Sequence, residues 1–271
     1  MMYKVSEILS FITDVAPLHW QESYDNSGLI VGDPNSVVDK ALLTIDVTED
    51  VVDEAIENSY HLIISHHPLI FKGIKNILTD NTLGRIITKA IRHDISIAAM
   101  HTNLDNSYFG VNRMLSEKIG LKNLQILRPS GVVSEQYGDS AFQIGSGMIG
   151  EFEEKMSELE FLKLIKEKLN VGALRHSELL GKPIKKVALC GGSGAFMIND
   201  AKGCKVDAYL TADVKYHEFF DADNELIVVD AGHFETEQFT KQLIADIILK
   251  KNPKFAVRIS SVKTNSVHYF V

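Results

Sequence analysis

The fold is decided by residues 61–68, His-Leu-Ile-Ile-Ser-His-His-Pro, in which an apolar run ends in two adjacent histidines. The short apolar run predicts a buried strand of an α/β sheet, where ligands bind just beyond the carboxyl ends of the strands. Successive side chains on a strand point to opposite faces, so His66 and His67 can serve one site only if the strand ends there. Pro68 marks that end, because it has no N–H group to donate to a neighbouring strand.

Two further apolar runs end in the same kind of residues. Residues 95–100 lead into His-Thr-Asn-Leu-Asp at 101–105, and residues 226–230 lead into Ala-Gly-His-Phe-Glu-Thr-Glu at 231–237. Three predicted strand ends therefore carry imidazoles and carboxylates. Borderline divalent ions such as zinc bind these groups well, and the pattern predicts a divalent-metal site.

His233 and Glu237 are four residues apart, so a helix that begins near Phe234 would place both on one face, where they could chelate an ion. The alternative is an ordinary helix start, at which acids are favoured by the helix dipole. Asp105 is the stronger ligand candidate of its segment, because a carboxylate can bridge two ions. The role of His101 stays open between a ligand, a residue supporting a ligand and a substrate contact.

Two polar segments follow other predicted strands. The Gly-Gly-Ser-Gly turn at 191–194 can aim amides at an anion, but a tight strand-to-helix turn is the preferred interpretation. Residues 211–217, Thr-Ala-Asp-Val-Lys-Tyr-His, contain the catalytic candidates Asp213 and His217, which are suited to act as acid and base beside a metal. The alternative for this segment is a solvated helix start.

Composition narrows the class of protein. The chain has 271 residues, 45% of them hydrophobic, and a net charge of −8, which argues against nonspecific nucleic-acid binding but does not exclude a nucleotide. We expect a cytoplasmic protein without membrane contact, because no apolar segment approaches the roughly 20 residues that span a bilayer and no secretory signal opens the chain. The two cysteines, Cys190 and Cys204, are expected to be reduced and buried.

Hydrophobic periodicity predicts alternating strands and helices, the pattern of βαβ units. Helices are expected at 5–15, after Thr48, at 82–92, from the Ser157 capping box to about 170, and at 234–250. Strands are expected at 41–47, 61–65, 95–100, 185–190, 208–211, 226–230 and 255–262, with strands and turns over 129–150. We predict an α/β protein with two lobes and mixed, largely parallel sheets. The first lobe comprises 1–125 and 225–271 and is expected to carry most of the metal ligands, and 126–224 form a second lobe inserted into it.

Taken together, these motifs give the chain a resemblance to a known family. It resembles the GTP cyclohydrolase 1 type 2 homologue family, also called the NIF-three-like family, from about residue 5 to 262. The matching stretches are 22–29 (Glu-Ser-Tyr-Asp-Asn-Ser-Gly-Leu), 65–68, 101–105, 191–194, 211–217 and 230–237. Two positions depart from the family pattern: Tyr24 stands where Trp is usual, and Ala212 where Gly is usual. Because Ala tolerates positive φ less well than Gly, Ala212 puts the turn before Asp213 in doubt.

The resemblance implies two α/β lobes, a dinuclear divalent-metal site and a ring-shaped homohexamer. It implies two divalent ions per chain. Histidine and carboxylate ligands suit zinc, iron or manganese alike, so the metal's identity stays open. The ligands carried over from the family are His66, His67, Asp105, His233 and Glu237.

The family name implies opening of the guanine imidazole ring of GTP, with C8 lost as formate. We therefore expect a dinuclear metal-dependent hydrolase-like protein that acts on a nucleotide, either GTP or another. The alternative is a noncatalytic metal- or nucleotide-binding regulator that acts through a protein partner.

Overall fold

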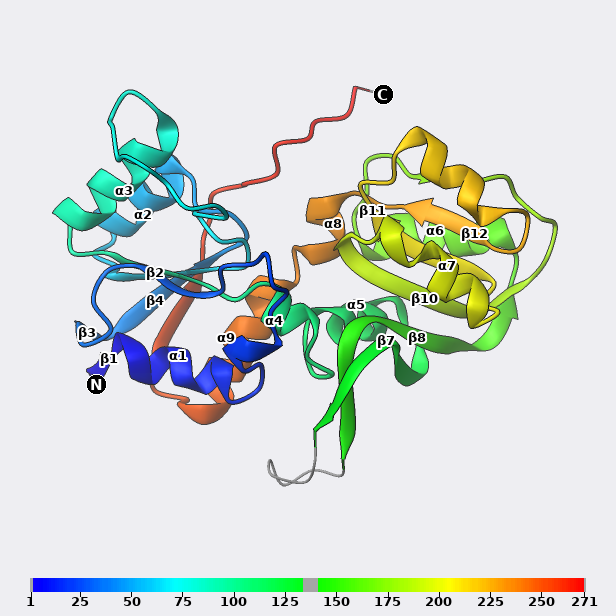
Figure 1. Cartoon of the computed structure of the whole chain (residues 1–271), viewed down its shortest axis with the longest axis horizontal. Helices are drawn as coiled ribbons and strands as arrows, with labels where there is room; N and C mark the ends of the chain where they lie inside the picture. The colour runs from blue at the N-terminus through cyan, green and yellow to red at the C-terminus, as the bar shows by residue number, and fades with distance from the viewer. Residues whose placement is uncertain (1, 134–140, 271) are drawn as a thin grey trace. The chain divides into compact units, whose positions relative to one another are not determined.

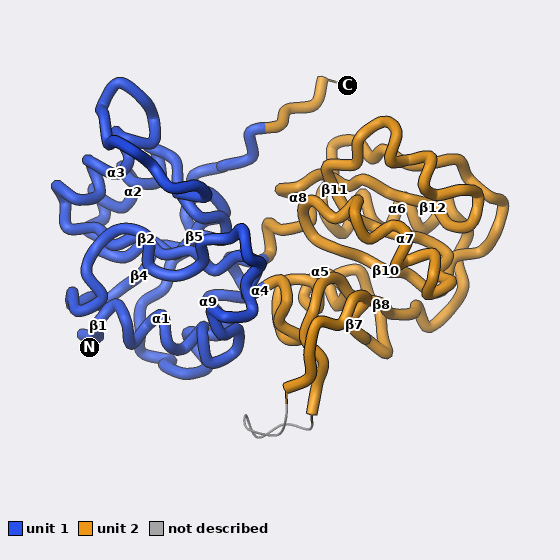
Figure 2. The backbone as a smooth tube through the Cα atoms, in the orientation of Figure 1, with its two compact units in different colours: residues 1–104, 240–266 blue, residues 105–239, 267–271 orange. Residues whose placement is uncertain are grey.

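The computed structural model describes residues 2–133 and 141–270, which form two compact units. Unit 1 comprises Met1–Leu104 and Thr240–Ser266, and unit 2 comprises Asp105–Phe239 and Val267–Val271 (Figure 2). Each unit has its own sheet, with helices on both faces, which confirms the predicted α/β class. Within the described residues, no helix combines the length and the apolar character needed to cross a bilayer.

The sheet of unit 1 has the strand order β13-β4-β5-β6-β2. Its strands are β2 (Gly28–Val31), β4 (Lys40–Thr44), β5 (Leu62–Ser65), β6 (Ser96–Ala99) and β13 (Ala256–Ile259). All neighbours pair in parallel except β2, which runs antiparallel to β6. A separate short pair joins β1 (Tyr3–Lys4) to β3 (Val37–Val38). The carboxyl ends of β4, β5 and β6 therefore meet at one edge of the sheet, which is where ligands bind in such folds.

Helices cover both faces of this sheet (Figure 1). They are α1 (Val5–Thr13), α2 (Glu49–Glu57), α3 (Thr82–Arg92) and α9 (Thr240–Lys251), with a 3-10 turn η1 at Leu18–Trp20. On the face covered by α2 and α3, Val52 and Ile87 join one buried cluster with Leu42, Ile63 and Ile97 of the strands. The predicted helix at 82–92 is confirmed, and Thr48 caps α2 as expected by accepting from the Val51 amide.

The sheet of unit 2 has the order β7-β8-β10-β11-β12-β9. Its strands are β7 (Lys122–Val133), β8 (Phe142–Met156), β9 (Arg175–His176), β10 (Ile184–Ser193), β11 (Ala208–Ala212) and β12 (Ile227–Asp230). Only β10–β11 and β11–β12 are parallel among the described strands, so this sheet is mixed, as predicted, with more antiparallel pairs than the sheet of unit 1. β7 and β8 are consecutive strands, and a short connection joins only antiparallel neighbours. The part of the predicted 129–150 segment at 134–140 lies outside the described residues.

Two sets of helices cover the faces of the second sheet. They are α5 (Val111–Ile119) and α6 (Glu158–Lys168) on one face, and η3 (Ala195–Met197), α7 (Ile198–Gly203) and η4 (Tyr216–Ala222) on the other. α6 begins at the predicted capping box, in which Ser157 accepts from the Glu160 amide and Glu160 accepts from the Ser157 amide. The short helices α4 (Thr102–Asp105) and α8 (His233–Glu237) follow β6 and β12.

The boundaries of the units differ from the predicted lobes of 1–125 plus 225–271 and 126–224. The structure assigns 105–125 and 225–239 to unit 2. Leu115 of α5 and Val229 of β12 are the reason, because both are buried in the core of that unit. The predicted helix at 234–250 is likewise two helices, α8 and α9. Phe239, between them, packs in unit 2, whereas Ile244 of α9 is buried in unit 1.

Candidate metal centre

In unit 1, three imidazoles gather at the carboxyl ends of two adjacent parallel strands. His66 and His67 follow β5 directly, and His101 comes two residues after β6, whose Ala99 is paired with Ser65 of β5. The ring centroids lie 4.9 Å apart for His66–His67, 5.2 Å for His66–His101 and 5.4 Å for His67–His101. Each ring offers a nitrogen within 4.8 Å of the others. This imidazole group is a plausible donor set for a divalent ion.

Each of these rings is fixed by a hydrogen bond at Nδ1. The Nδ1–H groups donate to the Met100 carbonyl at 2.9 Å (His66), to Asp46 Oδ1 at 2.7 Å (His67) and to Asp25 Oδ1 at 2.8 Å (His101). Because a carbonyl or an ionised carboxylate only accepts, the proton of a neutral ring must be on Nδ1. Nε2 is then the nitrogen with the lone pair. Metal-bound histidines in proteins show this arrangement, so these residues fit a divalent ion.

The two supporting carboxylates are held in their charged form. Burial acts to raise the pKa of Asp25, but hydrogen bonds from His101 and Thr102 outweigh it and keep that pKa well below its usual range. Burial also acts to raise the pKa of Asp46, but the hydrogen bond from His67 outweighs it and lowers that pKa below its ordinary value. Both carboxylates therefore remain acceptors at neutral pH.

In unit 2, His233 lies between two carboxylates. Its Nε2 is 3.0 Å from Glu237 Oε2, one helical turn away on α8, and its Nδ1 is 2.7 Å from Asp213 Oδ2, directly after β11. Burial acts to lower the pKa of His233, but hydrogen bonds to Asp213 and Glu237 raise it to about 11. The metal-free ring is thus an imidazolium. A divalent ion would take the place of its Nε2 proton, with Glu237 as the adjacent ligand and Asp213 supporting the ring.

Gly192 of β10 leaves room for this pair. It has a φ of 62°, and a Cβ built on it would overlap Glu237 Oε1 and come within 3.2 Å of His233 Nε2. The Gly192 amide donates to Thr236 Oγ1, and the Gly191 amide donates to Asn112 Oδ1, both at 2.9 Å. With these two amides already bonded, the structure favours a close-packing role for the glycines over an anion-binding turn.

Asp105 is the last residue of α4 and the first residue of unit 2. Its carbonyl accepts from Asn112 Nδ2 at 3.1 Å, the same side chain that receives the Gly191 amide. The backbone of Asp105 is thereby tied to the strand end beside His233 and Glu237. The five predicted ligands fall into two groups, one in each unit.

The catalytic candidates lie in different surroundings. Asp213 has a φ of 54° and accepts from His233, which makes it a support for a ligand. The positive φ falls on Asp213 itself, whereas Ala212 remains in β11, so the concern about Ala212 is resolved. His217 lies exposed on η4, stacked on Phe220 at 6.3 Å.

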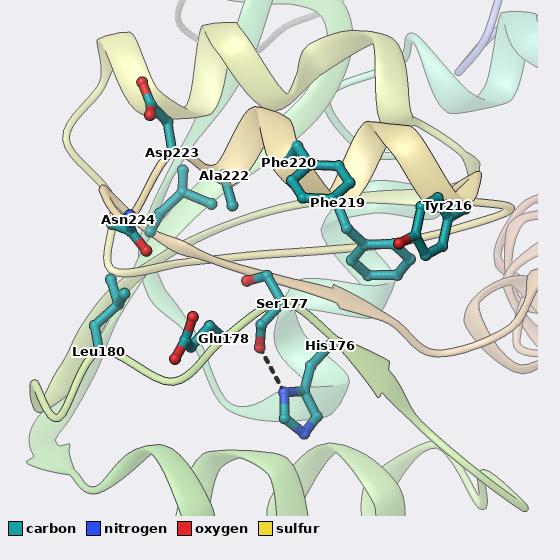
Figure 3. Close-up of a pocket in the computed structure, with 11 residues that line it drawn as sticks. His176, Ser177, Glu178, Leu180, Tyr216, Phe219, Phe220, Ala222, Asp223 and Asn224 are labelled. Atoms are coloured by element: carbon teal, nitrogen blue, oxygen red, sulfur yellow. Dashed lines mark hydrogen bonds between the residues drawn. The ribbon is translucent and has the colours of Figure 1, made fainter.

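Unit 2 also has a pocket of about 500 Å³ beside η4 (Figure 3). Tyr216, Phe219 and Phe220 of η4 line one side, and Ser177 and Glu178 follow β9 on the other. The lining residues include two carboxylates, Glu178 and Asp223, and no lysine or arginine. A triphosphate would meet negative charge here, so this pocket is a poor match for GTP.

Sequence reasoning missed the supporting residues Asp25 and Asp46. Asp46 falls inside the predicted strand at 41–47, whereas β4 ends at Thr44, so the strand-end rule that identified His66 applies to Asp46 only once the true end of the strand is known. Asp25 precedes β2, the antiparallel edge strand. The only sequence signal for Asp25 was its position in the stretch 22–29, which resembles the family. The structure places the His101 ring in the imidazole group, beside His66 and His67.

Comparisons with known proteins agree with the family resemblance of the sequence and with the fold. A family model described as Duf34/NIF3 (NGG1p interacting factor 3) matches residues 3–266. A Clostridium perfringens protein named GTP cyclohydrolase 1 type 2 homolog is 37% identical over 259 residues, or 95% of this chain and 93% of that protein. A Campylobacter jejuni protein of the same name is 37% identical over 275 residues, or 98% and 100%. The crystal structure of a Bacillus cereus protein related to NIF3 superposes with a TM-score of 0.92 at 28% identity, covering 99% of each chain.

Proposed function

Because this chain belongs to the Duf34/NIF3 family, we propose that it binds two divalent metal ions per chain and acts as a hydrolase on a nucleotide. The proposed ligands are His66, His67, Asp105, His233 and Glu237. The observation that carries the proposal is the bonding of the three histidines among these ligands, His66, His67 and His233. Each donates Nδ1–H to a fixed acceptor, as metal-bound imidazoles do.

Held by these residues, divalent ions would supply Lewis-acid chemistry for the attack of water and would offset the negative charge that develops. The chain's own residues would orient this chemistry. Asp46 holds the ring of His67, and Asp213 holds the ring of His233. Proton transfer by Asp213 or His217 remains a prediction, and of the two only Asp213 contacts a proposed ligand in the described part of the chain.

For the substrate we propose GTP, with the imidazole ring opened and C8 released as formate. This proposal rests on the name of the relatives, GTP cyclohydrolase 1 type 2 homolog. The net charge of −8 requires that the triphosphate be neutralised locally, and bound cations would supply that charge.

The test is formate release from GTP by protein that has been stripped of metal and then reloaded separately with zinc, manganese or ferrous iron. ATP and a phosphodiester serve as comparison substrates. We expect activity only after reloading, and a rate that rises with pH through about 7, the pKa of water bound to zinc in enzymes.

Two variants make the assay specific. Removal of a residue that supports a ligand lowers activity roughly 10–100-fold, and Asp105→Asn should lower it more, because Asp105 is itself a proposed ligand. His176→Ala should retain activity, because His176 is exposed and its ring bonds its neighbour's carbonyl, Ser177 O. If reloaded protein converts none of the substrates but binds a nucleotide or a protein partner tightly, the result contradicts the hydrolase proposal and favours a noncatalytic regulator.

We also propose that the chain assembles as a homohexamer, on the strength of the family resemblance. Sedimentation velocity at micromolar concentration should show one species at six times the mass of the chain. A monomer at every concentration would contradict the proposal.

A further inference from the structure

We infer that Asp25 is a positioning residue that orients His101 as a third imidazole of the group formed with His66 and His67, so that divalent-metal affinity depends on Asp25. This inference rests on the proposed metal-binding function and adds two residues to it. His101 and Asp25 come from distant parts of unit 1, the segment after β6 and the segment before β2.

The carboxylate of Asp25 is held from several directions. Its side chain is 0% exposed, and its Oδ1 accepts from His101 Nδ1 at 2.8 Å and from the Asn26 amide at 2.7 Å. Its Oδ2 accepts from the Thr102 amide and the Ser27 hydroxyl, both at 3.0 Å, and from the Thr102 hydroxyl. A carboxylate fixed in this way cannot rotate, and its orientation determines that of the His101 ring.

The far side of the His101 ring faces the other two imidazoles. With Nδ1 bound to Asp25, Nε2 is the nitrogen left for an ion, and the centroids of His66 and His67 lie 5.2 and 5.4 Å from that of His101. Phe71 packs edge-on against the same ring at 5.4 Å and limits its rotation. Asp25 therefore does for His101 what Asp46 does for His67.

A purely structural role for Asp25 makes a different prediction. Its bonds to Thr102 and Ser27 would then matter most, by tying the segment before β2 to the end of β6. Loss of Asp25 would in that case weaken metal binding to the same extent whether or not the His101 ring is present. A double-mutant cycle separates the two roles.

The experiment titrates metal-free protein with Co²⁺, whose visible absorption reports coordination geometry as well as affinity. The variants are Asp25→Asn, His101→Ala and the double variant. Thr102→Val, which removes one hydroxyl from the same carboxylate, and Asp53→Asn, which removes a surface ion pair with Lys89, serve as controls. We expect Asp25→Asn to weaken binding 10–100-fold in the parent, to change the spectrum, and to have little further effect in the His101→Ala background.

Equal losses in both backgrounds, or no loss in the parent, would overturn the inference while leaving the proposed function intact. If the unmodified protein does not bind Co²⁺ at all, both fail. A second measurement needs no variant and so does not depend on Asp25→Asn folding: ¹⁵N NMR of the metal-free protein should find the proton of neutral His101 on Nδ1. A proton on Nε2 would contradict the inference.

Discussion

Gly192 shows how tightly single residues are fitted around the proposed ligands. Its φ of 62° lies in the left-handed region, and the space beside its Cα holds the Glu237 carboxylate. The same residue donates its amide to Thr236 and offers its carbonyl to Thr211 Oγ1 at 3.1 Å. Only a residue without a side chain meets all these conditions, because L-residues are strained at this φ and a Cβ would displace the ligand.

Replacement of Gly192 by Ala should therefore affect stability and metal binding together. We expect a loss of about 1–2 kcal/mol from the backbone conformation alone, and a weaker metal affinity because Glu237 must move. The control is Gly203→Ala at the end of α7, where a Cβ meets nothing within 4 Å. This substitution should raise the free energy of unfolding by about 0.4–1 kcal/mol. Urea unfolding and metal titration of both variants measure the effects. Unchanged metal affinity in Gly192→Ala would count against the site.

The two cysteines should differ in reactivity. Burial, together with the charges of Asp105 and Glu237, raises the pKa of the Cys190 thiol, whereas Cys204 is only half-buried. Because the thiolate is the reactive form, native protein at pH 8 should be alkylated at Cys204 and protected at Cys190. Mass spectrometry of the labelled peptides, before and after unfolding, checks this. Rapid native labelling of Cys190 would show that the core around β10 opens readily.

At the level of elements, Glu54 connects α2 to the chain that leaves β13. Its carboxylate accepts from the Ser261 amide at 3.0 Å, from the Ser261 hydroxyl at 2.8 Å, and from the Ser260 hydroxyl. Burial acts to raise the pKa of Glu54, but these hydrogen bonds lower it below the ordinary value of 4.5. The ionised carboxylate thus stabilises the folded unit.

The direction of the pH effect follows from that lowered pKa. The contribution of Glu54 is fully present above about pH 4.5, its ordinary value, and is lost as the pH falls through the lower folded value. Glu54→Gln should cost about 2 kcal/mol at pH 7, and the difference from the parent should shrink at pH 3. Glu57→Gln, exposed on the same helix, is the control. A penalty that does not change with pH would mean that the charge of Glu54 is not what stabilises the contact.

Elements were predictable wherever local chemistry is strong. The Ser157 capping box and the Thr48 cap place the starts of α6 and α2 correctly, because each cap satisfies amides within its own segment. The division between α8 and α9 was missed, since apolar residues at helical spacing occur on both sides of Phe239 but are buried in different cores. A periodic pattern does not show which core a side chain enters.

In the site, too, residues positioned by their own segment were predictable and residues positioned by distant segments were not. His66 and His67 are adjacent to the strand that positions them, so strand-end reasoning was sufficient. The partners Asp25 and Asp213 are 76 and 20 residues from the histidines they support. Such pairs depend on sheet order and on the conformation of loops, neither of which the local sequence determines.

At the scale of the whole molecule, each unit carries its own group of proposed ligands at a sheet edge. His66 and His67 belong to unit 1, whereas Asp105, His233 and Glu237 belong to unit 2. Substitutions in either unit should therefore reduce the metal bound per chain, although each unit has a separate core. The two groups of ligands together predict two ions per chain.

Elemental analysis of protein purified without chelators tests that claim most directly. We predict two divalent ions per chain in the parent and fewer in both His66→Ala and Glu237→Ala, with the fold retained by circular dichroism. His93→Ala, which removes an exposed histidine beyond α3, should keep the parent's content. Full metal content in both ligand variants would contradict the assignment of the site.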